Sequence, residues 1–96
     1  MSLKTAYQEK LQAQLDERSA KIELLKAQRD KAEADAKIVY EQQISAVQGH
    51  YETAQTKMKQ LQASSEAAWE ELKGGIDQAW DSMSKAIKTA SARFTS

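Results

Sequence analysis

The clearest helical pattern of the chain lies in the stretch AWEELKGGIDQAWDSMSKAIKTASARF, from Ala68 to Phe94, whose pattern recurs every eleven residues. An Ala-Trp pair opens the stretch at Ala68, and a second pair follows at Ala79. Eleven residues make three helical turns, so apolar residues at matching slots align on one stripe about 100° wide. This stripe is a candidate interaction face, made of Trp69, Leu72, Ile76, Trp80, Met83, Ile87 and Phe94.

Two interpretations of this stripe are open. In the first, it packs against another helix of the same chain, and the two Trp side chains are large core anchors. In the second, it lies on a lipid surface, because eleven-residue amphipathic repeats also occur in exchangeable lipid-binding proteins. Acidic residues outnumber basic ones on its polar face, whereas a membrane-surface helix is more often basic. The sequence therefore favours packing within the chain and keeps lipid binding as the alternative.

Upstream of the repeat, apolar residues recur every three or four positions from Tyr7 to Leu61, which is helical periodicity. Arg18 and Arg29 occupy two positions of this ladder, and we expect their stems to pack while their charged ends reach outward. The spacing departs from a strict heptad, which relaxes a coiled-coil supercoil. The first part of the ladder is a candidate oligomer seam, made of Tyr7, Leu11, Leu15, Ile22 and Leu25.

The segment KAEADAK, residues 31–37, carries the smallest side chains of the ladder, Ala32 and Ala36. Small residues allow two helices to approach closely, so we expect close packing here. The functional alternative is an adaptable patch that contacts a partner.

Turn residues are scarce, since the chain has no proline and three glycines. A helix boundary is expected at Ser64-Ser65, because serine is a preferred N-cap and Glu66 then lies near the positive end of the next helix dipole. The sequence alone leaves open whether Gly49 or the Gly74-Gly75 pair also breaks a helix.

These patterns predict an all-α chain forming one domain over residues 1–96. We expect a long helix over about residues 5–63 and a second over about residues 66–94, packed back as a helical hairpin or coiled coil. At 1.5 Å per residue the first helix is roughly 90 Å long and the second roughly 45 Å. The second covers half of the first, so the seam must find another chain. We therefore expect a homo-oligomer, most simply a dimer.

Charge and composition narrow the function. Acidic and basic residues balance at fourteen each, which argues against a nucleic-acid partner. Cysteine is absent, and no apolar run approaches the roughly 20 residues needed to span a bilayer. The first residues lack the apolar core of a signal peptide. We therefore expect a cytoplasmic protein.

Residues that carry chemistry are sparse. His50 is the single histidine, and one imidazole without a second His or Cys does not make a metal site. No glycine-rich phosphate loop is present, and the serines have no histidine near them in sequence. We expect no catalytic residue, no cofactor and no metal, and we interpret the chain as not an enzyme.

Four segments suggest a family. KLQAQLDE at residues 10–17, KAEADAK at 31–37, AAWEELKGGIDQAW at 67–80 and ASARF at 90–94 resemble small bacterial coiled-coil proteins grouped as a stress-response family. The resemblance implies a cytoplasmic helical protein associated with stress, and it supplies no catalytic or binding residues. Gly49-His50 departs from the charged helix formers of that family.

Overall fold

The computed structural model describes residues 2–95, and the side chains of residues 2–93. It contains three helices, α1 (Leu3–Asp30), α2 (Ala34–Ala63) and α3 (Trp69–Thr95), and no strand among the described residues. The all-α class expected from composition and periodicity is confirmed. The predicted number of helices is wrong, because the sequence predicts two helices and the structure has three.

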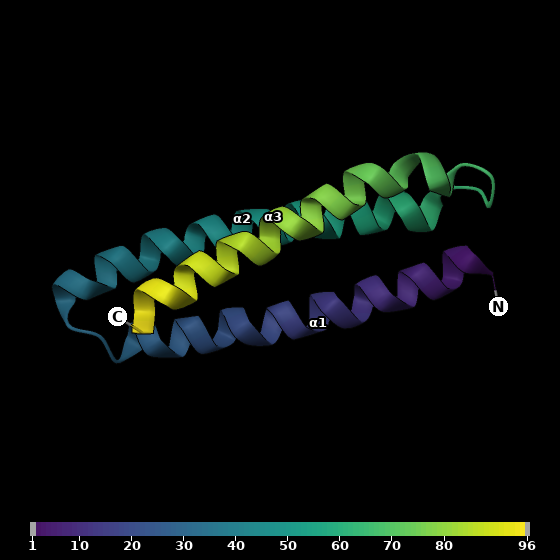
Figure 1. The fold of residues 1–96 in the computed structure, drawn as a ribbon. Helices are drawn as coiled ribbons and strands as arrows, with labels where there is room; N and C mark the ends of the chain where they lie inside the picture. The colour runs from purple at the N-terminus through teal and green to yellow at the C-terminus, as the bar shows by residue number, and fades with distance from the viewer. Residues whose placement is uncertain (1, 96) are drawn as a thin grey trace.

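The three helices form one elongated bundle. Helix α2 runs antiparallel to α1, and α3 returns alongside both, antiparallel to α2 and parallel to α1 (Figure 1). The molecule measures 51 × 20 × 19 Å, which is one helix length by about two helix diameters. An unbroken helix over residues 5–63 does not fit these dimensions.

The first reversal lies at residues 31–33, inside the segment expected to continue the long helix. The N–H groups of Lys31 and Ala32 donate to the carbonyls of Gln28 and Arg29 at 3.3 and 3.0 Å, which closes the last turn of α1. Glu33 is extended, with φ −70° and ψ 160°, and starts α2. No residue of the described chain has a positive φ, so this turn requires no glycine.

Burial explains why the chain reverses here. Burying one Leu or Ile side chain is worth about 1.5–3 kcal/mol, and the reversal lets four of them on α1 reach a shared core. Interrupting a helix sacrifices a few backbone hydrogen bonds, each worth a net 0.5–1.5 kcal/mol or so. Between Leu25 and Ile38 the chain has no large apolar side chain, so a break in this interval sacrifices least packing.

The second reversal follows the sequence prediction. Helix α2 ends at Ala63, and the Ser65 hydroxyl accepts a hydrogen bond from the Ala68 N–H at 3.1 Å. Glu70 and Glu71 lie in the first turn of α3, near the positive end of its dipole. The regular helix begins three residues later than the predicted start at residue 66, because one irregular turn precedes it.

The glycines do not interrupt any helix. Gly49 lies within α2, and Gly74 and Gly75 lie within α3. No atom beyond the local helix backbone lies within 4 Å of the Cβ position of any of the three. Close approach to another helix therefore does not explain these glycines.

The core runs along the bundle axis and is built from all three helices. Its largest fully buried side chains are Ile44, Leu61, Ile76, Met83 and Val47. Lys4 is the one charged residue buried among the described side chains, and its ammonium donates to the Ser64 carbonyl at the end of α2. A cation suits the negative end of a helix dipole, so this contact pins the start of α1 to the end of α2.

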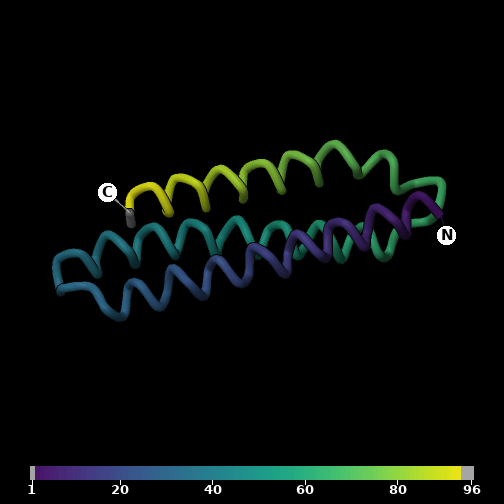
Figure 2. Tube along the Cα trace, turned by 60° about the horizontal axis from the view of Figure 1, so that its bottom comes forward, coloured from purple at the N-terminus to yellow at the C-terminus, as the bar shows by residue number. Residues whose placement is uncertain are grey.

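One end of the bundle is less covered than the rest. Helix α3 stops short of the α1–α2 reversal (Figure 2). In the first turns of α2, Ala36 is exposed, and Ile38 and Val39 are 61% and 41% exposed. The sequence predicted close helix packing at the small residues of segment 31–37, and for Ala36 this prediction is wrong.

Candidate functional site

The eleven-residue stripe of α3 lies inside the bundle. Trp69, Ile76, Trp80, Met83 and Ile87 belong to the hydrophobic core shared with α1 and α2. Leu72 is half-buried against the same core. The side chain of Phe94 lies outside the described part of the structure. The stripe thus packs against the chain's own helices.

Trp69 anchors the stripe at the start of α3. The Tyr7 ring from α1 packs against it with the ring centroids 5.6 Å apart. The Lys73 ammonium lies 5.4 Å from the centroid of Tyr7 and 5.8 Å from that of Trp69, within cation–π range. The Tyr7 hydroxyl donates a hydrogen bond to the Asp77 carboxylate. Burial first, then this hydrogen bond and the negative charge of Asp77, raise the pKa of Tyr7.

Trp80 occupies the middle of the stripe and differs from Trp69 in one respect. Its indole N–H is buried and has no hydrogen-bond partner among the described residues. An unsatisfied buried donor costs about 1–3 kcal/mol of stability. Trp80 therefore contributes packing area to the core at an energetic penalty.

The predicted oligomer seam also faces the interior. Leu11, Leu15, Ile22 and Leu25 are at most 5% exposed, and Tyr7 is half-buried against the same core. The expectation that this ladder lies uncovered along a long helix is wrong, because the reversal after α1 lets α2 and α3 cover it.

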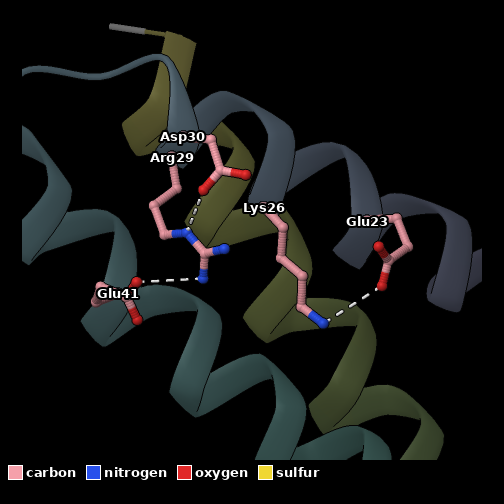
Figure 3. Close-up of polar contacts among 5 residues, drawn as sticks. All are labelled: Glu23, Lys26, Arg29, Asp30 and Glu41. Carbon is pink, nitrogen blue, oxygen red and sulfur yellow. Dashed lines mark hydrogen bonds and ion pairs between the residues drawn. The ribbon is translucent and has the colours of Figure 1, made fainter.

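Both arginines of the apolar ladder, Arg18 and Arg29, make contacts to another helix with their guanidinium groups. Nη2 of Arg18 donates to Oγ of Ser84 on α3 at 2.8 Å. Nη1 of Arg29 lies 3.2 Å from Oε1 of Glu41 on α2, as Figure 3 shows. The two side chains are 20% and 24% exposed, and their charged ends bridge helices rather than simply reaching outward as the sequence suggested.

An open cleft of about 350 Å³ lies between α1 and α3. It is lined by Arg18, Lys21, Ser84, Ile87, Lys88 and Ser91. The sequence did not reveal it, because its residues come from two helices and lie more than sixty positions apart in the chain. The only signal was that Arg18 and Lys21, and separately Ser84, Lys88 and Ser91, share a helix face by their spacing.

Other features of the described residues bear on chemistry. No group of three or more His, Cys, Asp or Glu side chains gathers closely enough to hold a metal ion, and His50 is exposed. Within residues 2–95, no helix combines the length and apolar character needed to cross a membrane.

Compared with known protein families, curated proteins and solved structures, the chain matches none of them.

Proposed function

We propose that this chain is a non-enzymatic structural or interaction protein that acts through the outer surface of a closed helical bundle. The observation that carries the proposal is the burial of the α3 stripe: Trp69 and Trp80 are 6% and 5% exposed. Because the apolar residues hold the bundle together, a partner meets mainly the polar outer faces. The resemblance to stress-associated coiled-coil proteins supports a role during stress.

Self-association is part of this proposal, most simply as a dimer. Since the seam is covered within one chain, the apolar surface left for a second chain is small. Among the side chains that the structure describes, its large members are Leu24, Ile38 and Val39 near the α1–α2 reversal and Leu3 at the other end. We place the contact at the reversal, where exposed apolar side chains come from two helices.

Light scattering after gel filtration tests the dimer. We expect a mass above one chain for the wild type and a lower mass for Ile38→Ser with Val39→Ser. Leu3→Ser is the matched control, because it removes a side chain that is 74% exposed at the opposite end. It should leave the mass unchanged. A wild-type monomer at micromolar concentration overturns the dimer.

Co-purification from stressed cells tests the interaction role. A partner that depends on the reversal should appear with the wild type and with Leu3→Ser, and should be lost with the Ile38 and Val39 double variant. Circular dichroism must show equal helicity for all three proteins. Equal recovery of the same proteins with every variant argues against this surface.

Lipid-surface binding is the second candidate, and one observation favours it. The buried N–H of Trp80 lacks an acceptor inside the bundle, whereas indole N–H groups find acceptors at a membrane interface. If α3 swung away from α1 and α2, its stripe would meet the lipid and Trp80 would gain a partner.

Tryptophan fluorescence separates the two candidates. A closed bundle predicts blue-shifted emission in buffer that changes little when vesicles are added. Lipid binding predicts that the emission wavelength changes further when vesicles are added. The change should be smaller in Trp80→Phe, and vesicles should protect the emission of the remaining Trp69 from an aqueous quencher. No change in emission or quenching with anionic or neutral vesicles rejects the lipid candidate.

A further inference from the structure

We infer that the cleft between α1 and α3 binds the phosphate group of a small anionic ligand. The inference starts from the charges that line it: Arg18 and Lys21 on α1 face Lys88 on α3, and no carboxylate belongs to the lining. In a chain whose formal net charge is zero, this local excess of cations is not a consequence of composition.

Neighbouring acids compensate these cations incompletely. Glu17 lies 3.7 Å from the Arg18 guanidinium and 3.8 Å from the Lys21 ammonium, which are long contacts for ion pairs. The Glu17 side chain is 60% exposed, so water screens its charge. Lys88 has no carboxylate three or four residues away on α3, where helix neighbours lie, and it makes no ion pair with another described residue.

The guanidinium of Arg18 is already positioned. Its hydrogen bond to Ser84 holds it against α3, and the Arg18 side chain is 20% exposed. Since the Ser84 oxygen accepts this bond, the Ser84 hydroxyl hydrogen is free to point to an anion. Most guanidinium N–H groups also remain available, and their planar arrangement suits two oxygens of one phosphate.

The donors and the size of the cleft select phosphate over a simple carboxylate. A phosphate group carries about −1.5 to −2 charges at pH 7 and three strong acceptor oxygens, which matches three cations and flanking hydroxyl groups. The volume of about 350 Å³ is within the roughly 300–1,000 Å³ of small-molecule clefts. Buried Ile87 forms an apolar wall of the cleft.

The other clefts do not share this character. The one between α1 and α2 that contains Lys26 also contains Glu23 and Glu52, so its charges offset. The third has Lys59 as its one charged residue. Of these three clefts, only the one between α1 and α3 combines several cations with hydroxyl groups and no acid.

Nuclear magnetic resonance with inorganic phosphate tests the inference. At constant ionic strength set with sodium chloride, phosphate should shift the amide signals around residues 18–21 and 84–91 and leave the far surface of α2 unchanged. Replacing Lys21→Gln together with Lys88→Gln should weaken binding about tenfold or more, because each lysine contributes a charge-assisted hydrogen bond.

Lys85→Gln is the matched control. Lys85 lies on the same helix and carries the same charge, but it pairs with Asp81 at 3.0 Å and is 75% exposed outside the cleft. This variant should bind phosphate within about twofold of the wild type, since the Lys85 charge is offset by Asp81 and screened by water. Equal losses in both variants, or shifts spread over all lysines, overturn the inference.

Two further probes identify the source of the phosphate group. Glycerol 3-phosphate is a soluble phosphate monoester, and vesicles of phosphatidylcholine containing phosphatidic acid present the same group on a lipid. Vesicle binding that needs Lys21 and Lys88 assigns a lipid headgroup, whereas binding of the soluble ester alone assigns a free metabolite. Absence of binding to all three phosphate probes rejects the site.

Discussion

Arg29 at the end of α1 and Glu41 near the beginning of α2 form an ion pair of 3.2 Å across the first chain reversal. Nε of Arg29 also forms an ion pair with Oδ1 of Asp30 at 3.1 Å. One guanidinium therefore contacts carboxylates of both the last turn of α1 and α2 (Figure 3). Both carboxylates are exposed, at 60% and 69%. This pair orients the reversal, but water screening limits what it contributes to stability.

The reversal is held by packing rather than by this ion pair. Glu41→Gln should lower the free energy of unfolding by less than about 1 kcal/mol, whereas Leu25→Ala, which empties a core position, should lower it by about 2–5 kcal/mol. Urea denaturation of both variants measures the difference. A larger effect for Glu41→Gln contradicts this ranking.

The reversal itself predicts a short distance between two remote positions. The chain has no cysteine, so spin labels at Glu9→Cys and Gln60→Cys report one distance only. Those residues should lie about one bundle width apart, comparable with the 20 Å short axis. An unbroken helix places them about 75 Å apart. Electron-spin resonance distinguishes the two, and dilution with unlabelled protein separates pairs within a chain from pairs between chains.

The glycines of α3 predict a gain in stability. Gly74→Ala and Gly75→Ala should each raise the free energy of unfolding by about 0.5–1 kcal/mol, because alanine favours the helix and its Cβ meets no other atom within 4 Å. Thermal denaturation provides the measurement, and Gly49→Ala in α2 should behave alike. A loss of stability in any of these variants would instead indicate that a second chain packs closely against the glycines.

Trp80 should be a large contributor to stability despite its unsatisfied N–H. Trp80→Ala is expected to cost about 3–5 kcal/mol, because it leaves a cavity in the core. Trp80→Phe should cost much less, since it keeps most of the ring area and removes the orphan donor. Chemical denaturation compares the two with Gln78→Ala, an exposed control on the same helix. Similar costs for both Trp80 variants contradict this account.

Tyr7 should make stability depend on alkaline pH. Burial and Asp77 raise its pKa in the folded state, whereas the unfolded value is about 10. The neutral hydroxyl therefore stabilises the fold fully below about pH 10, and this contribution is lost as the pH rises toward the folded pKa. Tyr7→Phe should be less stable than the wild type by about 0.5–1.5 kcal/mol at neutral pH.

The difference in unfolding free energy between the wild type and Tyr7→Phe should shrink above about pH 10, because only the wild type can ionise at this position. Denaturation at a series of pH values, at fixed ionic strength, measures this difference. A difference that stays constant up to strongly alkaline pH shows that neither burial nor Asp77 raises the pKa of Tyr7 in the folded protein.

Periodicity predicted that the chain is helical and which face of α3 is buried, because both depend on spacing within one segment. Ser65 was identifiable as a cap for the same reason: its hydroxyl serves an N–H three residues away. The cleft between α1 and α3 was not predictable, since Lys21 and Lys88 approach each other only after the chain has reversed twice. No local pattern specifies which faces of two remote helices meet.

Local sequence patterns are sufficient to predict the helical class, the amphipathic stripe from Trp69 to Ile87 and the boundary near Ser65. The division of residues 3–63 into α1 and α2, by contrast, depends on tertiary packing. Residues 31–33 contain no proline or glycine, and their local propensity permits a continuous helix. The chain breaks there because the free energy of burying Leu11, Leu15, Ile22 and Leu25 against distant residues exceeds the cost of a few helical hydrogen bonds.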